Sequence, residues 1–412
     1  MRCIEVSPLP NTPYESLRIS NPALKAIVSV VTWAAERFGF WARPRKGAAG
    51  ELSEMNILDN LYWVYKSKNP IQQPEAELDQ SGFMTKTAVQ LSTADISDTS
   101  NSVTLSFAGD ILRTHRASVA KDQVYAEIED LLFQDDILVA NYESPVTTQP
   151  LIDEVIGDAG PPIECASEEQ FDALTSHNER FIDVLNLANN HILDMGVEGL
   201  ETTLNVLSDR NIMQIGVNES LAEATAVKTI ERKGIKFGFA SCAFGTNGHA
   251  LPEGQKQSIN IAKLTSKHQA PDTTLLKTQI SNAKAAGCDL VIGIIHWGHE
   301  FELFPRRAQQ EAAQDLAEFG ADLIVCHHPH VPQPIQLYRT QTGDRTVPIA
   351  YSLGSLLWGF ADRDIASSTI MQIEVQKTEG KAEITNLKAT PVRWHAHEMD
   401  GNVFQKVARS EG

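Results

Sequence analysis

Short runs of consecutive apolar residues recur along the chain from Val103 onward, and polar turns separate them. Such runs are typical of strands that are covered on both faces. The pattern predicts strands at residues 103–108, 137–140, 181–187, 237–242, 290–295, 323–325 and 349–352. Between them, apolar residues at helical spacing predict helices, notably at 197–207 and 308–319. This alternation of strands and helices indicates an α/β protein.

Turn residues mark where some of these elements end. Gly320 follows the helix predicted at 308–319, at a place where glycine commonly ends a helix. Towards the C-terminus, residues 370–375 and 382–387 flank Glu379-Gly380, and this arrangement predicts a β-hairpin.

The first hundred residues follow a different pattern. Helices are predicted at 23–38 and around 55–65, with a basic link at 43–46 and a polar, Ser/Thr-rich passage up to residue 102. No chemical motif occurs there, so we expect an accessory lid or docking region. The sequence thus predicts three parts: a mostly helical and linker region at 1–100, a catalytic domain at 101–395 and a C-terminal tail at 396–412.

Composition and charge narrow the class of protein. The chain has 412 residues, 42% of them hydrophobic, which is enough for a large domain or two ordinary ones. Its 53 acidic and 35 basic side chains give a formal charge of -18. Proteins that bind nucleic acid or anionic lipid usually carry the opposite sign, so we expect neither as the main partner. The five cysteines show no CxxC spacing, which favours a reducing compartment.

The N-terminal pattern bears on localisation. The first 24 residues carry no basic start followed by an apolar run, as a signal peptide would. The apolar stretch at 26–35 is about half of the ~20 residues that span a bilayer. We therefore expect no membrane insertion and a cytoplasmic protein. The sequence leaves the oligomeric state open.

Metal-compatible side chains follow five of the predicted strands: Asp110; Asn141 and Glu143; Asn190 and His191; His296; and His327, His328 and His330. In an α/β sheet, ligands bind beyond the carboxyl ends of the strands, so these residues are expected to converge on one pocket. Carboxylate, amide oxygen and imidazole together suit Mn, Zn or Fe. The set contains no thiolate, which disfavours a structural zinc site.

Each of these residues alone has a plainer explanation. Asp110 after a strand could be an ordinary turn residue, and Asn141 and Glu143 could cap the next segment. His296 could be a buried, hydrogen-bonded histidine. A coincidence at five strand ends is a weaker explanation than a metal site.

Taken together, the motifs resemble the CapA (poly-γ-glutamate capsule synthesis) family, which is related to the calcineurin-like metallophosphoesterases. The resemblance covers residues 103–391. It is carried by Gly109-Asp110, Asn141-x-Glu143-x-Pro145, the string LNLANNHILDMG at 185–196, His296-Trp297-Gly298-x-Glu300 with Pro305 and Gln310, Gly320-Ala321-Asp322, His327-His328-Pro329-His330-Val331 and Tyr351-Ser352-Leu353-Gly354.

The resemblance implies a four-layer α/β/β/α sandwich with a divalent metal centre of one or two ions at one sheet edge. The ligands it implies are Asp110, Glu143, Asn190, His296, His328 and His330. It also implies that His191 is the catalytic residue that donates a proton or stabilises charge. Three positions depart from the pattern. Leu112 stands where these phosphoesterases carry a ligand histidine, and Cys326 and Ser355 stand where CapA proteins usually carry Gly and Asn.

Further residues extend the expected site. Asp194 could orient His191, although an N-cap role fits it equally well. Arg113 and Arg306 could hold an anionic substrate, or they could be solvated surface charges. Asn141 and Glu300 complete the expected substrate contacts, and Glu300 could instead support the metal ligands or bind a substrate amine.

These residues predict a metal-dependent hydrolase acting on a phosphoester or amide bond. The expected substrate is small and anionic or amino-acid-like. Two other functions stay open: amide-bond formation in poly-γ-glutamate or amino-acid-derived metabolite synthesis, and a non-catalytic scaffold. No Gly-rich phosphate loop occurs, so use of ATP would need a different kind of site.

Overall fold

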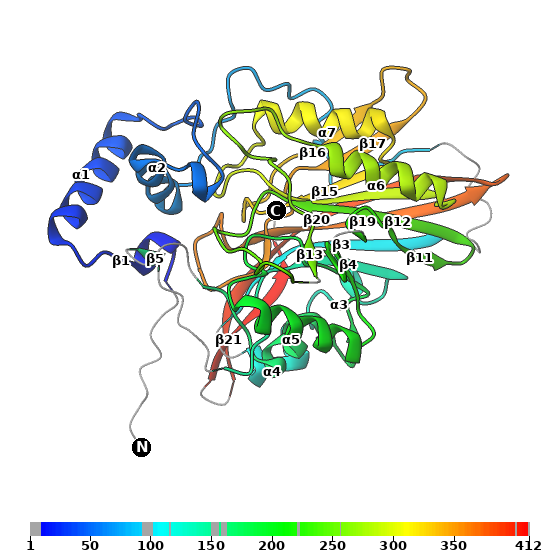
Figure 1. The fold of residues 1–412 in the computed structure, drawn as a ribbon, viewed down its shortest axis with the longest axis horizontal. Coiled ribbons are helices and arrows are strands. Elements are labelled where there is room, and N and C mark those ends of the chain that lie inside the picture. Colours follow the sequence, from blue (N-terminus) through cyan, green and yellow to red (C-terminus); the bar gives the residue numbers. More distant parts are fainter. Residues whose placement is uncertain are drawn as a thin grey trace.

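The structure is a computed structural model that describes residues 10–92, 102–114, 117–149, 156–157, 163–220, 223–255, 257–399 and 402–410. Within these residues, two large sheets pack face to face and helices cover both outer faces (Figure 1). The molecule is therefore a four-layer α/β/β/α sandwich, which confirms the expected fold class.

The first large sheet has six strands among the described residues, in the order β11 (Lys228–Arg232), β12 (Ile235–Ala243), β14 (Leu290–His296), β15 (Leu323–His327), β17 (Thr346–Ala350) and β16 (Ile335–Arg339). The four inner strands are parallel, and the two outer strands are antiparallel to their neighbours. The carboxyl ends of the parallel strands therefore lie at one edge of this sheet.

The second large sheet has nine strands over the same described ranges. Its main path is β2 (Ala88–Gln90), β20 (Lys381–Met399), β19 (Ser367–Thr378), β3 (Val103–Ile111), β4 (Ile137–Tyr142), β8 (Val184–Asn186) and β9 (Met213–Ile215). Two further strands pair beside this path: β18 (Ser355–Leu357) with β3, and β21 (Asn402–Arg409) with β20. From β3 to β9 the strands are parallel, as in the first sheet.

Apolar residues fill three layers between these elements. Side chains of β3 and β4 face those of β12 and β14 between the sheets, for example Phe107, Val139, Phe237 and Ile292. The outer face of the six-stranded sheet is covered by α6 (Thr274–Ala285) and α7 (Arg307–Phe319). The other outer face is covered by α3 (Glu129–Leu132), α4 (Glu168–Thr175) and α5 (Gly196–Asp209). Strands buried on both faces explain the apolar runs in the sequence.

The smaller elements connect these layers. They comprise the short helices η1 (Pro13–Ser16), η2 (Leu52–Glu54) and η4 (Ala117–Gln123), and the strand pairs β1 (Leu17–Arg18) with β5 (Ile156–Gly157), β6 (Ser176–His177) with β7 (Arg180–Phe181), and β10 (Val217–Asn218) with β13 (Ser258–Ile259). The strand predicted at 181–187 is thus split between β7 and β8.

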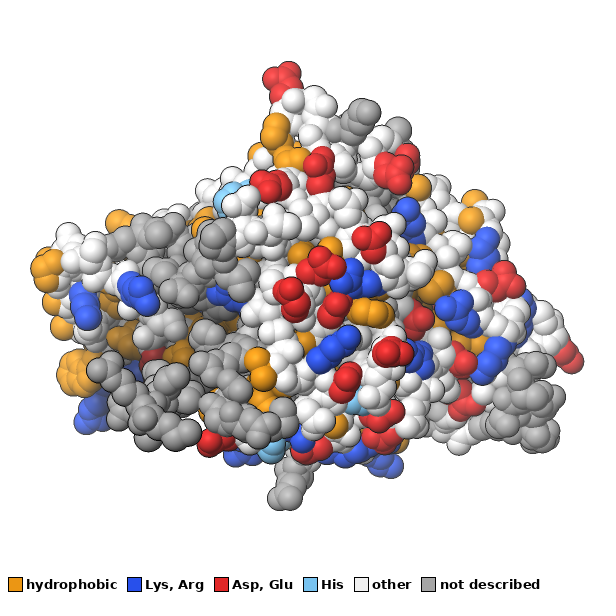
Figure 2. Space-filling model, turned by 90° about the horizontal axis from the view of Figure 1, so that it is seen from below, with side chains coloured by type: hydrophobic (Ala, Val, Ile, Leu, Met, Phe, Trp, Pro, Cys, Tyr) orange, Lys and Arg blue, Asp and Glu red, His pale blue; other side chains and the backbone are white. Residues whose placement is uncertain are grey.

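The N-terminal region lies at one end of the sandwich (Figure 1). Its two helices are α1 (Pro22–Phe38) and α2 (Ile57–Lys68), and both begin at an asparagine whose side chain accepts backbone N–H groups. Downstream of α2 the chain runs along the α/β sandwich and adds β2 to the edge of the nine-stranded sheet. Figure 2 shows apolar side chains gathered at this end, and those of Ile27, Val30 and Trp33 on α1 are exposed.

Near the C-terminus, β19 and β20 form the expected hairpin. Glu379 and Gly380 at its turn both have positive φ angles, of 52° and 83°. The hairpin is longer than predicted, and the stretch expected as a tail contributes β21, which pairs along β20. Over the described residues, no helix has the length and apolar character needed to cross a bilayer.

Candidate metal centre

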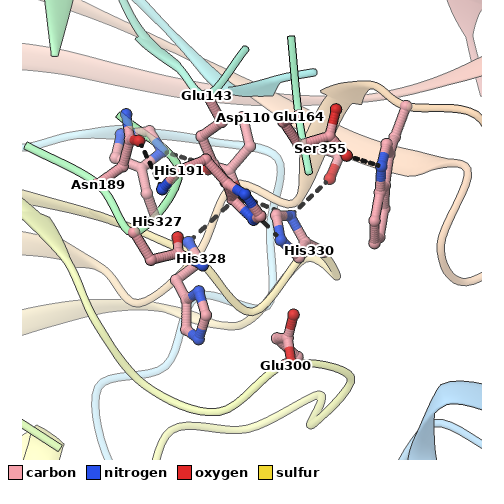
Figure 3. Close-up of polar contacts among 12 residues, drawn as sticks. Asp110, Glu143, Glu164, Asn189, His191, Glu300, His327, His328, His330 and Ser355 are labelled. Carbon is pink, nitrogen blue, oxygen red and sulfur yellow. Dashed lines mark hydrogen bonds and ion pairs between the residues drawn. The ribbon is translucent and has the colours of Figure 1, made fainter. Parts of the chain in front are cut away.

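Five strands from the two sheets end at the same edge of the sandwich and supply the polar side chains of one cluster (Figure 3). Asp110 comes from β3, Asn141 from β4, His296 from β14 and His327 from β15, while Glu143 directly follows β4. The fifth strand, β8, leads into the loop that carries Asn190 and His191. Parallel strands place their carboxyl ends together, which is why residues far apart in sequence meet here.

Asp110, Glu143 and His296 form the centre of the cluster. Each offers a ligand atom, and these three atoms lie within 4.8 Å of one another. All three side chains are fully buried. Buried carboxylates and imidazoles at this separation suit a divalent cation, because burial without a counter-charge is costly.

Asn141 holds the two carboxylates in place. Its Nδ2 donates to Asp110 Oδ1 at 2.8 Å and to Glu143 Oε1 at 2.5 Å. Its Oδ1 accepts from Nδ2 of Asn186 at 2.8 Å, and Ser241 Oγ donates to Asn186 Oδ1 at 2.6 Å. This buried chain crosses from one sheet to the other, so Asn141 acts as a support for the carboxylates rather than as an open substrate contact.

Asp110 is contacted by His327, which ends β15, and by His328 and His330 in the loop that follows. His327 Nδ1 lies 3.0 Å from Asp110 Oδ1, and His330 Nδ1 lies 3.2 Å from Asp110 Oδ2. The backbone N–H of His328 donates to Asp110 Oδ2 at 3.2 Å. His328 and His330 adopt positive φ angles of 99° and 57°, which are strained for non-glycine residues. Such strain is common at ligand sites, where the surrounding structure maintains it.

The structure also shows where residues that depart from the expected family pattern lie relative to the cluster. Leu112 is buried in the core and offers no ligand, whereas His327 brings an imidazole to Asp110 from β15. Ser355 Oγ lies 3.0 Å from His330 Nδ1 and can orient this ring. Gly109 lets β18 approach, because a Cβ at this residue would lie 1.9 Å from the carbonyl oxygen of Gly354.

The electrostatics of the cluster fit a cation. Burial by itself raises the pKa of Asp110, but the imidazoles of His327 and His330 hold that pKa well below its usual value. Burial and the Asp110 carboxylate raise the pKa of Glu143 well above its usual value. Burial lowers the pKa of His296 and of His328, so both rings are neutral and have a lone pair to offer.

Four buried atoms of the cluster have no hydrogen-bond partner: Glu143 Oε2, His327 Nδ1, His328 Nδ1 and His330 Nε2. Unsatisfied buried polar atoms are rare in native proteins and call for an explanation such as an ion. Three of the four belong to residues expected as ligands, and the fourth belongs to His327. The residues present therefore fit a divalent metal ion.

Asn190 and His191 lie beside this centre. Asn190 Oδ1 is 2.7 Å from His296 Nε2. His191 Nδ1 is 2.7 Å from Asp194 Oδ2, and both side chains are buried. Burial lowers the pKa of His191, but the Asp194 carboxylate outweighs it and raises the pKa to about 9. Asp194 forms no side-chain cap of α5, so of its two expected roles the structure supports the contact with His191.

Glu164 belongs to this neighbourhood, although the sequence gave no reason to single it out. It is fully buried, its backbone N–H donates to Asp194 Oδ2 at 2.8 Å, and Trp358 Nε1 donates to its carboxylate at 3.3 Å. Burial raises its pKa. It stands alone between two prolines and a cysteine, and no spacing or motif marks it.

The residues expected to bind substrate make different contacts in the structure. The backbone N–H of Arg113 donates to Ser144 Oγ at 2.7 Å, and its guanidinium faces Cys165. Glu300 lies to one side of the cluster in Figure 3 and accepts a hydrogen bond from Trp63 Nε1 of α2.

Arg306 is not brought to the cluster. Its guanidinium binds Glu302 at 2.6 and 2.8 Å and Glu75 at 3.0 Å, so it joins the α/β sandwich to the N-terminal region. It is 9% exposed, so it is not a solvated surface charge either. The structure thus assigns Arg306 a role in docking the N-terminal region.

A cavity of about 540 Å³ opens beside the cluster. One side of its lining comes from the α/β sandwich, including Asn190, His191 and His328, and the other comes from α1, α2 and the residues around them. This size is typical of small-molecule sites. The N-terminal region therefore forms part of the wall of the site.

Known proteins match the part of the chain that holds the cluster. A family model described as bacterial capsule synthesis protein PGA_cap matches residues 104–359. The PGA biosynthesis protein CapA of Bacillus subtilis is 29% identical over 300 residues, which cover 69% of this chain and 72% of that protein. The capsule biosynthesis protein CapA of Bacillus anthracis is 29% identical over 267 residues, 62% of this chain and 60% of that protein.

More distant matches extend this list. A probable polyglutamine synthesis accessory protein of Mycobacterium tuberculosis is 26% identical over 226 residues, 54% of this chain and 55% of that protein. Among solved structures, the calcineurin-like phosphoesterase YfkN from Bacillus subtilis is similar over 70% of this chain and 90% of that chain, at 14% identity and a TM-score of 0.37. The family model spans more than half of the 412 residues and includes every residue of the buried cluster. The chain belongs to the PGA_cap family of bacterial capsule synthesis proteins.

Proposed function

We propose that this protein is a metal-dependent hydrolase that cleaves a phosphoester or amide bond. The observation that carries the proposal is the buried set of Asp110, Glu143 and His296 within 4.8 Å, next to the paired His191 and Asp194. When bound, a divalent ion supplies Lewis acidity that polarises the phosphoryl or acyl group to be attacked. Mn, Zn and Fe suit the donors present.

The residues of this chain take separate roles. Asp110, Glu143, Asn190 and His296 would hold the ion, together with imidazoles from the end of β15 and the loop that follows it: His327, His328 and His330. His191 protonates the leaving group, and Asp194 keeps its ring in a fixed orientation through the 2.7 Å contact. Asn141 keeps the two carboxylates at their spacing. Arg113 and Glu300 are candidates for contacts with the rest of the substrate.

The relatives suggest a substrate with amino-acid character. Two are named for the biosynthesis of PGA or of capsule, and a third is named a synthesis accessory protein. These names also favour a second candidate function, in which the same site forms an amide bond, and a third, in which the protein is a scaffold. A cytoplasmic location stays a prediction of the sequence.

Metal content and turnover test the proposal together. Protein stripped with a chelator and reloaded with Mn²⁺ is incubated with a panel of phosphomonoesters and γ-glutamyl amides, and released phosphate or amine is measured. We expect turnover that depends on the metal and is lost in His191→Gln. If the metal-bound protein hydrolysed neither the phosphomonoesters nor the γ-glutamyl amides, the proposed hydrolase activity would be wrong. Consumption of ATP that requires an added amino acid would instead support amide formation, and absence of bound metal would support the scaffold.

A further inference from the structure

The cavity beside the metal centre has two chemically different ends. Asn190, His191 and His328 lie at one end, and Glu300 and Asn247 add further polar groups. His328, one of the proposed metal ligands, lines this end and is only 3% exposed, so a head group bound here would lie next to the ion.

The other end of the cavity comes from the N-terminal region and is mainly apolar, and the charged groups of Asp59 and Lys66 in its lining are paired with Lys267 and Glu302. Its wall includes Leu24 and Val28 of α1, Leu52 of η2, and Ile57, Leu61 and Val64 of α2. Leu24 is 43% exposed, Leu52 37% and Ile57 80%. Large apolar side chains that face a cavity and remain exposed to water gain free energy when an apolar ligand covers them.

The wall is held firmly against the catalytic domain. Tyr62 Oη donates to Glu302 Oε1 at 2.9 Å, and Lys267 Nζ lies 3.0 Å from Asp59 Oδ2. Further along the chain, Ile71 N donates to the carbonyl oxygen of Phe301 at 2.8 Å. These contacts fix α2, so the apolar wall faces the metal centre at a set position.

Trp63 joins the two ends of the cavity. It lies on α2 among the apolar residues, and its Nε1 donates to the carboxylate of Glu300. Its ring also packs edge-on against Phe301, with 6.2 Å between ring centroids. Trp63 therefore fixes Glu300 of the catalytic domain from the side of the N-terminal region.

We propose that the substrate is amphiphilic: an anionic or amide head group lies at the metal centre, and an aliphatic or aryl group of several carbons lies against the wall built by α1, η2 and α2. The proposal rests on the proposed function only in placing the reacting bond at the metal end. The apolar wall lies outside residues 104–359, which the family model matches, so this half of the specificity belongs to the N-terminal region of this chain.

Non-hydrolysable alkylphosphonic acids test this inference without turnover. Binding of the methyl, butyl, hexyl and octyl compounds is measured by calorimetry on the Mn²⁺-loaded protein. We expect affinity to rise about threefold for each methylene that enters the cavity. Removal of the metal should weaken every member but leave the ratio between octyl and methyl compounds, because the wall does not involve the ion.

Two matched variants on α1 locate the effect. Leu24 and Ile27 are both exposed, at 43% and 54%, but of the two only Leu24 lines the cavity. Leu24→Asn, alone or with Leu52→Asn, should reduce the octyl-to-methyl ratio at least threefold, while Ile27→Asn should leave it unchanged. Circular dichroism of each variant checks that α1 remains folded.

The outcomes separate the two proposals. Equal affinities along the series would overturn the amphiphilic substrate, and so would a loss of chain-length dependence in Ile27→Asn but not in Leu24→Asn. If affinity depended clearly on chain length but no ester or amide were hydrolysed, the amphiphilic substrate would be supported and the proposed hydrolase activity would be wrong.

Discussion

The two sides of the cavity are built in different ways. On the side of the candidate metal centre, buried polar groups hold one another through short contacts, as Asn141 does with Asp110 and Glu143. On the N-terminal side, apolar side chains form much of the surface, and a few ion pairs such as Arg306 with Glu75 hold it in place. A change on the first side should therefore abolish the chemistry, whereas a change on the second should alter substrate choice or stability. Four experiments test this division.

Asp110→Asn should give the largest effect. The substitution removes the charge that both His327 and His330 approach within 3.2 Å, while preserving the shape of the side chain. We expect metal content to fall below one tenth of the wild-type value and turnover to drop about a thousandfold or more. Elemental analysis and steady-state kinetics measure both. Asp209→Asn, at the exposed end of α5, is the control and should change neither.

His191→Gln should reduce turnover about 10²- to 10⁴-fold, because it removes the proton donor. Metal content should stay at the wild-type level, since the imidazole is not among the proposed ligands. His395→Gln, on the exposed face of β20, is the matched control. Unchanged kcat in His191→Gln would show that the proton comes from another group.

Arg306→Met tests the other side of the comparison. Removing one partner of a buried ion pair leaves Glu302 without its main counter-charge, and we expect the free energy of unfolding to fall by about 3 kcal/mol. Arg307→Met, which removes an exposed charge paired with Glu311, should leave the free energy of unfolding nearly unchanged. Urea denaturation measures both values. Metal affinity of the folded Arg306→Met protein should equal that of the wild type, and a loss of metal would contradict the division.

Acid should weaken the same contact, with a smaller effect. Burial raises the pKa of Glu302, but Arg306 and Lys66 outweigh it and hold the pKa well below the ordinary value of 4.5. The carboxylate therefore stabilises the folded state above about pH 4.5, and this contribution is lost as the pH falls towards the folded pKa. The difference in unfolding free energy between wild type and Glu302→Gln should be largest at neutral pH and shrink below pH 4.5. A difference that grew with acid would reverse this sign.

Much of the fold was readable from the sequence. Helices such as α5 and α7 lie within a few residues of their predictions, because their apolar stripes and end residues are local signals. The strands that carry the cluster were also found, since central strands buried on both faces read as apolar runs. Edge strands such as β11 and β16 were missed, because their half-exposed patterns resemble those of loops.

Some residues of the candidate site could be predicted from the sequence, and others could not. The sequence placed Asp110, Glu143 and His296 at strand ends, and parallel strands bring such ends together whatever the details of packing. It could not find Glu164, whose partners Ser144 and Trp358 lie 20 and 194 residues away. Contacts of this kind leave no spacing or period in the chain.

By itself, the sequence indicated the family through its motifs. Local periodicity and strand direction determined the α/β alternation and the residue types that gather at one sheet edge. Only the tertiary structure decided that Arg306 binds Glu75, 231 residues away, and that α1 and α2 close the cavity over the metal centre. The physical reason is that such docking depends on complementary charge and shape between distant surfaces, which exist only once both have folded.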